Sequence, residues 1–307
     1  MVATGGGVAS GGYDVAVYGD AAAILMRTSL AGTMLLTAAC GSGTSTSTTK
    51  AESASASASA VPAGPPAGVL AIGHSGLTGE SSDPAKVGAP APENSWATGT
   101  SPEVDSVYLR LLAVRPETKD RVANRAVGGA QAFALAGQAA AGLKEVPNPA
   151  LVIVQTIDND IRCDGADAAN VSTFGSQLTD ALSIITAAAP KAKILMVGQI
   201  GRPATAVKAI GQLPAEKQKL TGTGPCDLFD PAGNVATAKV AALTKIIEGY
   251  EAEQARVCET LPQCVTDNGA LGRFVDRPDY SIAGHLTRPA LANVAALIWP
   301  TVRKLLL

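Results

Sequence analysis

Short apolar runs alternate with longer amphipathic or alanine-rich segments over the C-terminal three-quarters of the chain. The apolar runs predict buried strands, and the longer segments predict helices. The predicted strands lie at 69–72, 121–124, 151–157 and 193–197, and the clearest predicted helices lie at 177–188, 235–257 and 288–306. Helices between successive strands favour βαβ units, which form a parallel sheet covered on both faces. The pattern therefore predicts a three-layer α/β/α domain with a central parallel sheet of about five strands.

The segment 41–68 has a different composition from the rest of the chain. It consists mainly of Ser, Thr, Ala, Gly and Pro, with few large apolar side chains. Such a segment buries too little apolar surface to offset the conformational entropy lost on ordering. We predict a disordered linker at 41–68 and a single folded domain at 69–307.

The N-terminal region 1–40 contains the features of an export signal. Met26 is followed by an arginine and then by a short apolar run. Small residues come next, immediately before Cys40. This order resembles a bacterial lipoprotein signal, which implies that Cys40 is lipidated, although Thr37 stands where leucine is usual. The acidic, glycine-rich segment 1–25 does not suit such a signal, so we infer that the true start is Met26. We expect a protein of the cell envelope, either lipid-anchored or secreted, and a soluble protein with a leader is the alternative.

Four further cysteines support export. An even number of cysteines in an exported chain indicates disulfides. Cys258 and Cys264 are close enough in sequence to close a small loop, which leaves Cys163 to pair with Cys226. Sequence alone leaves the other two connectivities open. A metal site is the rival interpretation, but no CxxC pair or neighbouring histidine supports it.

Charge and motif content exclude several other functions. The formal net charge is −2, and no basic stripe is present, which argues against a nucleic-acid partner. No segment is long enough to span a membrane by itself. The glycines around Gly222 lack the spacing of a phosphate-binding loop, so we expect no cofactor. We also expect a monomer.

Residues with catalytic chemistry follow two of the predicted strands. Ser75 lies in a Gly-His-Ser-Gly segment after the first strand, and Asn159 follows the third. Working residues of a parallel sheet lie on loops beyond the carboxyl ends of its strands, so these two are expected to share a site. The chain has two histidines, His74 and His285. A serine activated by a histidine base is the arrangement used in acyl transfer.

The order of these motifs resembles the SGNH (GDSL-like) hydrolases, particularly exported actinobacterial esterases and lipases, over roughly residues 68–302. The matching segments are Gly73-His74-Ser75-Gly76, Asn124-Arg125-Ala126-Val127-Gly128-Gly129-Ala130, Ile157-Asp158-Asn159-Asp160 and His285-Leu286-Thr287. The resemblance implies a flavodoxin-like fold, with Ser75 as nucleophile and His285 as general base. It also implies an oxyanion hole formed by the N–H groups of Ser75 and Gly129 and by the side-chain amide of Asn159.

Two positions depart from the family pattern near the predicted nucleophile. His74 replaces an aspartate that serves the local hydrogen bonding of the turn, and Ile157 replaces a glycine. His74 is a rival base, but adjacent residues on a strand-end turn rarely face each other's reacting atoms. We therefore expect His285, rather than His74, to be the base.

The third member of a catalytic triad is also altered. The family has aspartate three residues before the catalytic histidine, and that position is Ile282 here. The nearest acids are Asp279 and Asp276. We expect Asp279 to orient His285, with Asp276 or a Ser–His dyad as the alternatives.

These observations predict an exported serine ester hydrolase that acts on a small-molecule or lipid ester. Trp96 follows the nucleophile segment and either forms a wall of the substrate pocket or packs in the core. Two other functions stay open. One is a carbohydrate O-deacetylase of the same fold, and the other is a non-catalytic envelope lipoprotein that binds acylated ligands.

Overall fold

The computed structural model describes residues 64–282 and 284–307. The predicted signal at 1–40, the lipidation of Cys40 and most of the linker at 41–68 lie outside these residues. Five strands form one parallel sheet, and two short strands form an antiparallel hairpin. The sheet strands are β1 (Val69–Gly73), β2 (Val122–Asn124), β3 (Leu151–Gln155), β4 (Lys193–Val197) and β5 (Cys264–Thr266), and the hairpin strands are β6 (Ser281–Ile282) and β7 (His285–Leu286).

Seven α-helices accompany these strands in the described part of the chain. They are α1 (Val107–Val114), α2 (Leu135–Glu145), α3 (Asp167–Ala188), α4 (Pro203–Ile210), α5 (Pro214–Lys219), α6 (Thr237–Cys258) and α7 (Arg288–Leu306). The short 3₁₀ helices are η1 (Ser75–Leu77), η2 (Pro92–Asn94), η3 (Pro116–Thr118), η4 (Ala132–Ala134), η5 (Leu271–Arg273) and η6 (Pro278–Tyr280). Within the described residues, no helix has both the length and the apolar content that crossing a membrane requires.

The sheet has the strand order β2-β1-β3-β4-β5, with every neighbouring pair parallel. This is the flavodoxin-like order, in which the chain changes direction at the first strand. The predicted three-layer domain with about five parallel strands is confirmed. The sequence does not predict β5, because this strand has only three residues and one fully apolar side chain. That is too short a run to show the hydrophobic pattern of a buried strand.

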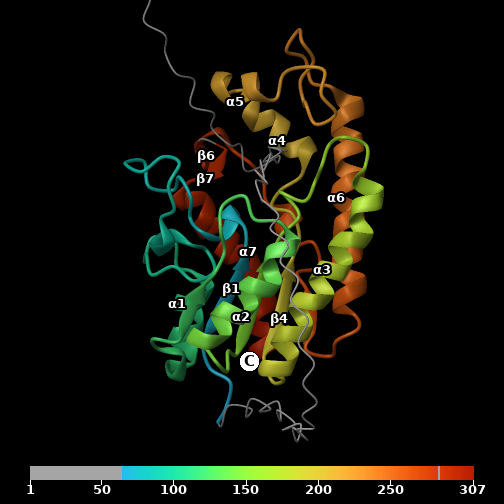
Figure 1. The fold of residues 1–307 in the computed structure, drawn as a ribbon. Helices are drawn as coiled ribbons and strands as arrows, with labels where there is room; N and C mark the ends of the chain where they lie inside the picture. The colour runs from blue at the N-terminus through green and yellow to red at the C-terminus, as the bar shows by residue number, and fades with distance from the viewer. Residues whose placement is uncertain (1–63, 283) are drawn as a thin grey trace, which may run out of the picture. The chain divides into compact units, whose positions relative to one another are not determined.

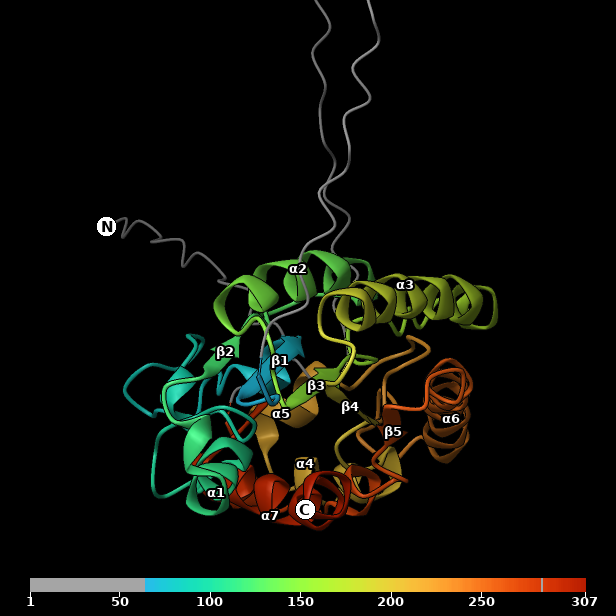
Figure 2. The same ribbon diagram turned by 90° about the horizontal axis from the view of Figure 1, so that it is seen from below.

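Helices cover both faces of the sheet, and the alternation of side chains along β1 shows why. Leu70 and Ile72 pack in one core with α2, α3 and α6, whereas Val69 and Ala71 pack in a second core with α1 and α7. Figure 2 shows α2 and α3 on one side of the strands and α1 and α7 on the other. A strand with both faces buried reads as a continuous apolar run, as the sequence of β1 does.

The predicted disulfide pairing is confirmed. Cys163 is bonded to Cys226, and Cys258 is bonded to Cys264, with Cα–Cα distances of 5.5 Å and 5.2 Å. The second bond joins the end of α6 to the start of β5, so the short edge strand is covalently tied to the helix that precedes it.

Candidate active site

The site begins where β1 ends, at a glycine whose position leaves no room for a side chain. Gly73 has φ +147°, and a Cβ at this position would overlap the backbone carbonyl oxygen of Gln155 on the neighbouring strand. Gln138 of α2 holds both backbone groups of Gly73. Its Oε1 accepts the Gly73 N–H at 2.7 Å, and its Nε2 donates to the Gly73 carbonyl at 3.0 Å. The chain is therefore fixed in direction immediately before the predicted nucleophile.

His74 stabilises the turn that carries Ser75. Its Nδ1 accepts the N–H of Gly76 at 3.1 Å, and its Nε2 lies 3.0 Å from Oδ2 of Asp158. Because Nδ1 is an acceptor, the ring proton resides on Nε2, where it faces the carboxylate. Nδ1 caps the turn and Nε2 lies at ion-pair distance from Asp158, so this buried ring supports the turn that carries Ser75. The contact with Asp158 was not anticipated from the sequence.

Ser75 is the first residue of η1 and is only 3% exposed. Its Oγ has no hydrogen-bond partner within residues 64–282 and 284–307. Ser75 and His285 line one cavity, although they are far apart in sequence. The structure thus brings together the two residues expected to be nucleophile and base.

The cavity has both ionisable and apolar lining residues. The nucleophilic or ionisable ones are Ser75, Glu80, Asp158, Asp276, Arg277 and His285, and the apolar ones, which we call the apolar wall, are mainly Ile200, Ala206, Ala209, Ile210, Leu213 and Leu286. Much of the apolar wall belongs to α4 and the turn after it. Figure 1 shows α4, α5 and the β6–β7 hairpin at the same end of the molecule.

His285 is carried by the β6–β7 hairpin, where it pairs with Ile282. The preceding Gly284 has φ +79°, a conformation that glycine adopts without strain. Nε2 of His285 lies 3.5 Å from Oε1 of Glu80, and the His285 side chain is 7% exposed. Sequence reasoning missed Glu80, since nothing in the motifs marks an acid five residues after the nucleophile.

The two aspartates considered as the third catalytic residue lie in different environments. Both carboxylate oxygens of Asp279 pair with Arg277, at 2.9 Å and 2.8 Å, and this side chain is 58% exposed. Asp279 is not among the described residues that line the cavity, whereas Asp276 is. Burial raises the pKa of Asp276 to about 6. The structure therefore places Asp276, and not the favoured Asp279, in the cavity that contains His285.

The predicted oxyanion-hole residues lie next to each other. Asn159 Nδ2 donates to the Ala130 carbonyl at 3.1 Å, and Gln131 Nε2 donates to the Asn159 carbonyl at 2.5 Å. The same loop passes beside the nucleophile at Gly128, where a Cβ would lie 4.0 Å from the Ser75 Cβ. Neither Gly129 nor Asn159 is among the described residues that line the cavity.

A buried carboxylate fixes the loop that carries Asn159. Asp160 accepts hydrogen bonds from the Thr156 hydroxyl at 2.5 Å and from the Ala132 N–H at 2.9 Å. Burial raises the pKa of Asp160, and these hydrogen bonds oppose that shift. Asp160 therefore connects the end of β3 with η4 and positions the neighbouring loops.

Asn124 and Trp96 both have structural roles. The Asn124 amide donates to the Leu77 carbonyl at 2.8 Å and to the Thr98 hydroxyl at 2.9 Å, which ties β2 to the end of η1. Trp96 is fully buried in the core beneath α1 and α7 and is not among the described cavity residues. Of the two interpretations of Trp96, the structure supports packing in the core over a wall of the pocket.

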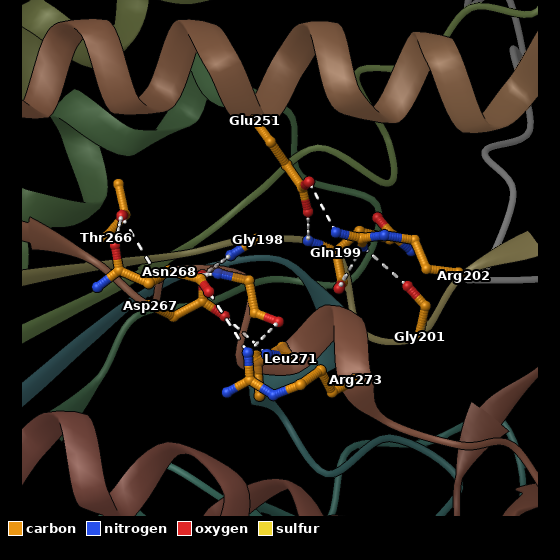
Figure 3. A network of polar contacts seen from close by, with 11 residues as sticks. Gly198, Gln199, Gly201, Arg202, Glu251, Thr266, Asp267, Asn268, Leu271 and Arg273 are labelled. Carbon is orange, nitrogen blue, oxygen red and sulfur yellow. Dashed lines mark hydrogen bonds and ion pairs between the residues drawn. The ribbon is translucent and has the colours of Figure 1, made fainter.

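A polar network supports the loop after β4, which contributes Gln199 and Ile200 to the cavity. Figure 3 shows Glu251 of α6 reaching this loop, where it accepts the Gln199 N–H at 3.0 Å and pairs with Arg202 at 2.8 Å. Asp267 holds the other side of this loop, where it accepts the Gly198 N–H at 3.3 Å. Burial raises the pKa of Glu251, and the charge of Arg202 opposes the shift.

Ile157 occupies a backbone conformation that normally requires glycine. Its φ is +109° and its side chain is fully buried. A β-branched residue at positive φ is strained, and such strain costs on the order of 1–3 kcal/mol. Ile157 thus combines a strained backbone with a fully buried apolar side chain.

Ile157→Gly is expected to be more stable than Ile157→Ala by about 1 kcal/mol, because glycine relieves the strain that alanine retains. In a helix the order reverses, since glycine is disfavoured there by about 1 kcal/mol. Ile185 of α3 is equally buried and provides the matched pair of control variants. Urea unfolding of all four variants measures the difference, and the same order at both positions would contradict the strain.

No family model and no curated protein sequence matches the chain. Solved structures do match it, at low identity. A crystal structure of TesA is 18% identical with a TM-score of 0.45, over 78% of this chain and 99% of that chain. An extracellular lipase from Streptomyces rimosus is 16% identical with a TM-score of 0.47, over 78% of this chain and 99% of that chain. Phospholipase A1 from Streptomyces albidoflavus NA297 is 15% identical with a TM-score of 0.45, over the same shares.

At such identities the similarity concerns the fold alone. The structure adds its own observations, namely the order of the parallel strands and the cavity at which two distant motifs meet. The strand order gives this chain the three-layer fold that the resemblance of its motifs to the SGNH hydrolases implies, and Ser75 and His285 lie at one cavity of that fold.

Proposed function

We propose that the protein is a serine ester hydrolase. The observation that supports this proposal most strongly is the position of Ser75 and His285 in one cavity. His285 takes the proton of the Ser75 hydroxyl as Oγ attacks the ester carbonyl, and then returns it to the leaving alcohol. Water, activated by the same histidine, hydrolyses the acyl-enzyme and regenerates Ser75.

The oxyanion of the tetrahedral intermediate needs hydrogen-bond donors. We assign this role to the N–H groups of Ser75 and Gly129 and to the amide of Asn159. The loop of Gly129 passes beside Ser75, and the Asn159 amide has a second hydrogen besides the one donated to Ala130. Preorganised donors of this kind typically contribute about 10²–10³ in rate each.

Protonated His285 requires a carboxylate that stabilises its positive charge. The ion pair with Arg277 keeps the Asp279 carboxylate at the surface. Glu80 and Asp276 line the cavity together with His285. We therefore propose a Ser75–His285 pair whose imidazolium form is stabilised by the carboxylates of the cavity, without a contribution from Asp279.

The substrate is proposed to be an ester with an apolar acyl group. The wall formed by α4 is lined by alanine, isoleucine and leucine side chains, which favour an acyl chain longer than acetyl. This observation disfavours an O-deacetylase. Export remains part of the proposal, supported by the two disulfides, which persist in oxidising compartments.

Labelling with a fluorophosphonate tests the assignment of the nucleophile. The full chain should hydrolyse p-nitrophenyl esters, with a preference for butyrate or hexanoate over acetate. The phosphonate should block this activity and appear on the peptide that contains Ser75 in a mass spectrum. An adduct on another residue, or hydrolysis that survives full labelling, would contradict the proposal.

A further inference from the structure

We propose that Glu80 makes this enzyme selective for esters whose alcohol is cationic, and that the cavity discriminates against anionic alcohols. The inference rests on the proposed ester hydrolase function and concerns the part of the substrate that leaves first. Glu80 lies on the segment after η1 and belongs to none of the motifs that define the nucleophile, the base or the oxyanion hole.

The position of the leaving alcohol follows from the chemistry of proton return. His285 must protonate the alcohol oxygen as the C–O bond breaks, so that oxygen must lie within hydrogen-bond distance of Nε2. Oε1 of Glu80 lies 3.5 Å from the same nitrogen. The first atoms of the alcohol must therefore pass directly beside the Glu80 carboxylate.

The second carboxylate oxygen extends this contact toward the nucleophile. Oε2 of Glu80 lies 2.8 Å from the position that a Cβ of Gly128 would occupy, and that position is 4.0 Å from the Ser75 Cβ. The carboxylate thus spans the space between His285 and the loop beside Ser75. A side chain at position 128 would displace the Glu80 carboxylate from this place.

The surrounding charges strengthen the effect of Glu80. Asp158 and Asp276 line the same cavity, and the described lining residues include no lysine. Arg277 lines it as well, but its guanidinium is paired with the surface carboxylate of Asp279. The Glu80 side chain is only 18% exposed, so solvent and salt screen its charge incompletely. A cavity with several carboxylates and few cations concentrates cations and repels anions.

The two kinds of lining therefore fit the two parts of one substrate. The apolar side chains of α4 accept an uncharged acyl chain, and the Glu80 carboxylate beside His285 accepts a positively charged alcohol. The substrate class that matches is the ester of a fatty or branched acyl group with an amino alcohol.

Three hexanoyl esters with matched acyl groups test the proposal on the full chain. The alcohols are choline, its uncharged isostere 3,3-dimethylbutanol, and the anionic 2-hydroxyethanesulfonate. The kcat/KM of the choline ester should exceed that of the isostere by about tenfold, and that of the isostere should exceed the anionic ester by a similar factor. Glu80→Gln should reduce the ratio between choline and anionic esters by about tenfold.

Two variants serve as controls for the charge change. Glu248 is an exposed glutamate of α6, so Glu248→Gln removes the same charge away from the cavity and should leave the ratio unchanged. Glu80→Asp keeps the charge and should retain most of the selectivity. If Glu80→Gln does not fold, the wild-type protein still provides a test. Its ratio of kcat/KM between the choline and anionic esters must decrease as the salt concentration is raised, because salt screens the carboxylate charge.

The outcomes separate the inference from the proposed function. An equal loss for all three esters in Glu80→Gln would show that Glu80 only positions His285, and it would overturn the inference. Selectivity that is absent or reversed in the wild type would overturn it as well. If Ser75→Ala hydrolyses the uncharged ester as fast as the wild type, the proposed function fails, and the inference fails with it.

Discussion

Ser75→Ala is expected to lower kcat/KM for ester hydrolysis by a factor on the order of 10⁴ or more, with little change in stability. Oγ has no hydrogen-bond partner among the described residues, so its removal leaves no polar group unsatisfied in the fold. It does remove the atom that forms the acyl-enzyme, and enzymes of this mechanism lose nearly all of their rate acceleration with it. Initial rates on p-nitrophenyl hexanoate and urea unfolding of both proteins measure the two effects.

The two histidines provide the matched comparison for this prediction. His285→Ala should lose about as much activity as Ser75→Ala, and the double variant should lose little more, because the two residues act as a unit. His74→Asn should retain far more activity, since an asparagine oxygen can still accept the Gly76 N–H that His74 accepts. A larger loss in His74→Asn than in His285→Ala would reverse the assignment of the base.

Gly73→Ala is expected to destabilise the fold by about 3 kcal/mol or more, which is the second large effect. The added Cβ would meet a backbone carbonyl of β3, which cannot rotate away as a side chain would. Any shift of the strand would also break the two hydrogen bonds from Gln138. Because Ser75 follows within two residues, the remaining folded protein should also be less active.

Gly249→Ala is the control for the same chemical change. Gly249 lies in α6, and a Cβ there would have nothing within 4 Å. Alanine in a helix is favoured over glycine, so this variant should be stabilised by about 0.5–1 kcal/mol. Thermal and urea unfolding compare both variants with the wild type. A Gly73→Ala protein of wild-type stability would show that the sheet adjusts to the added methyl group at this position.

Several features of the domain followed from local patterns in the chain. The apolar runs of β1, β3 and β4 and the long amphipathic segments of α6 and α7 determined the layers, because strands buried on both faces must be continuously apolar. The motif order correctly placed Ser75 and His285 at one cavity. Sequence spacing also identified the pairing of Cys258 with Cys264, since a loop of that length closes readily.

Other features depended on contacts between residues distant in the chain. Spacing favoured Asp279 as the partner of His285, but the ion pair with Arg277 holds that carboxylate at the surface. Trp96 had two equal interpretations until the packing of α1 and α7 around it decided in favour of the core. Glu80 carried no motif at all, and only the return of the hairpin to the end of β1 places His285 beside it.

The sequence by itself thus determined the fold class, indicated Ser75 and His285 as the residues of the proposed chemistry and favoured the observed disulfide pairing, because each depends on local periodicity, residue type or short spacing. The tertiary structure decided which acids surround the base, that His74 supports the turn, and that Ile157 is strained. Those properties depend on burial, and on side-chain contacts between segments that the chain brings together only when it folds.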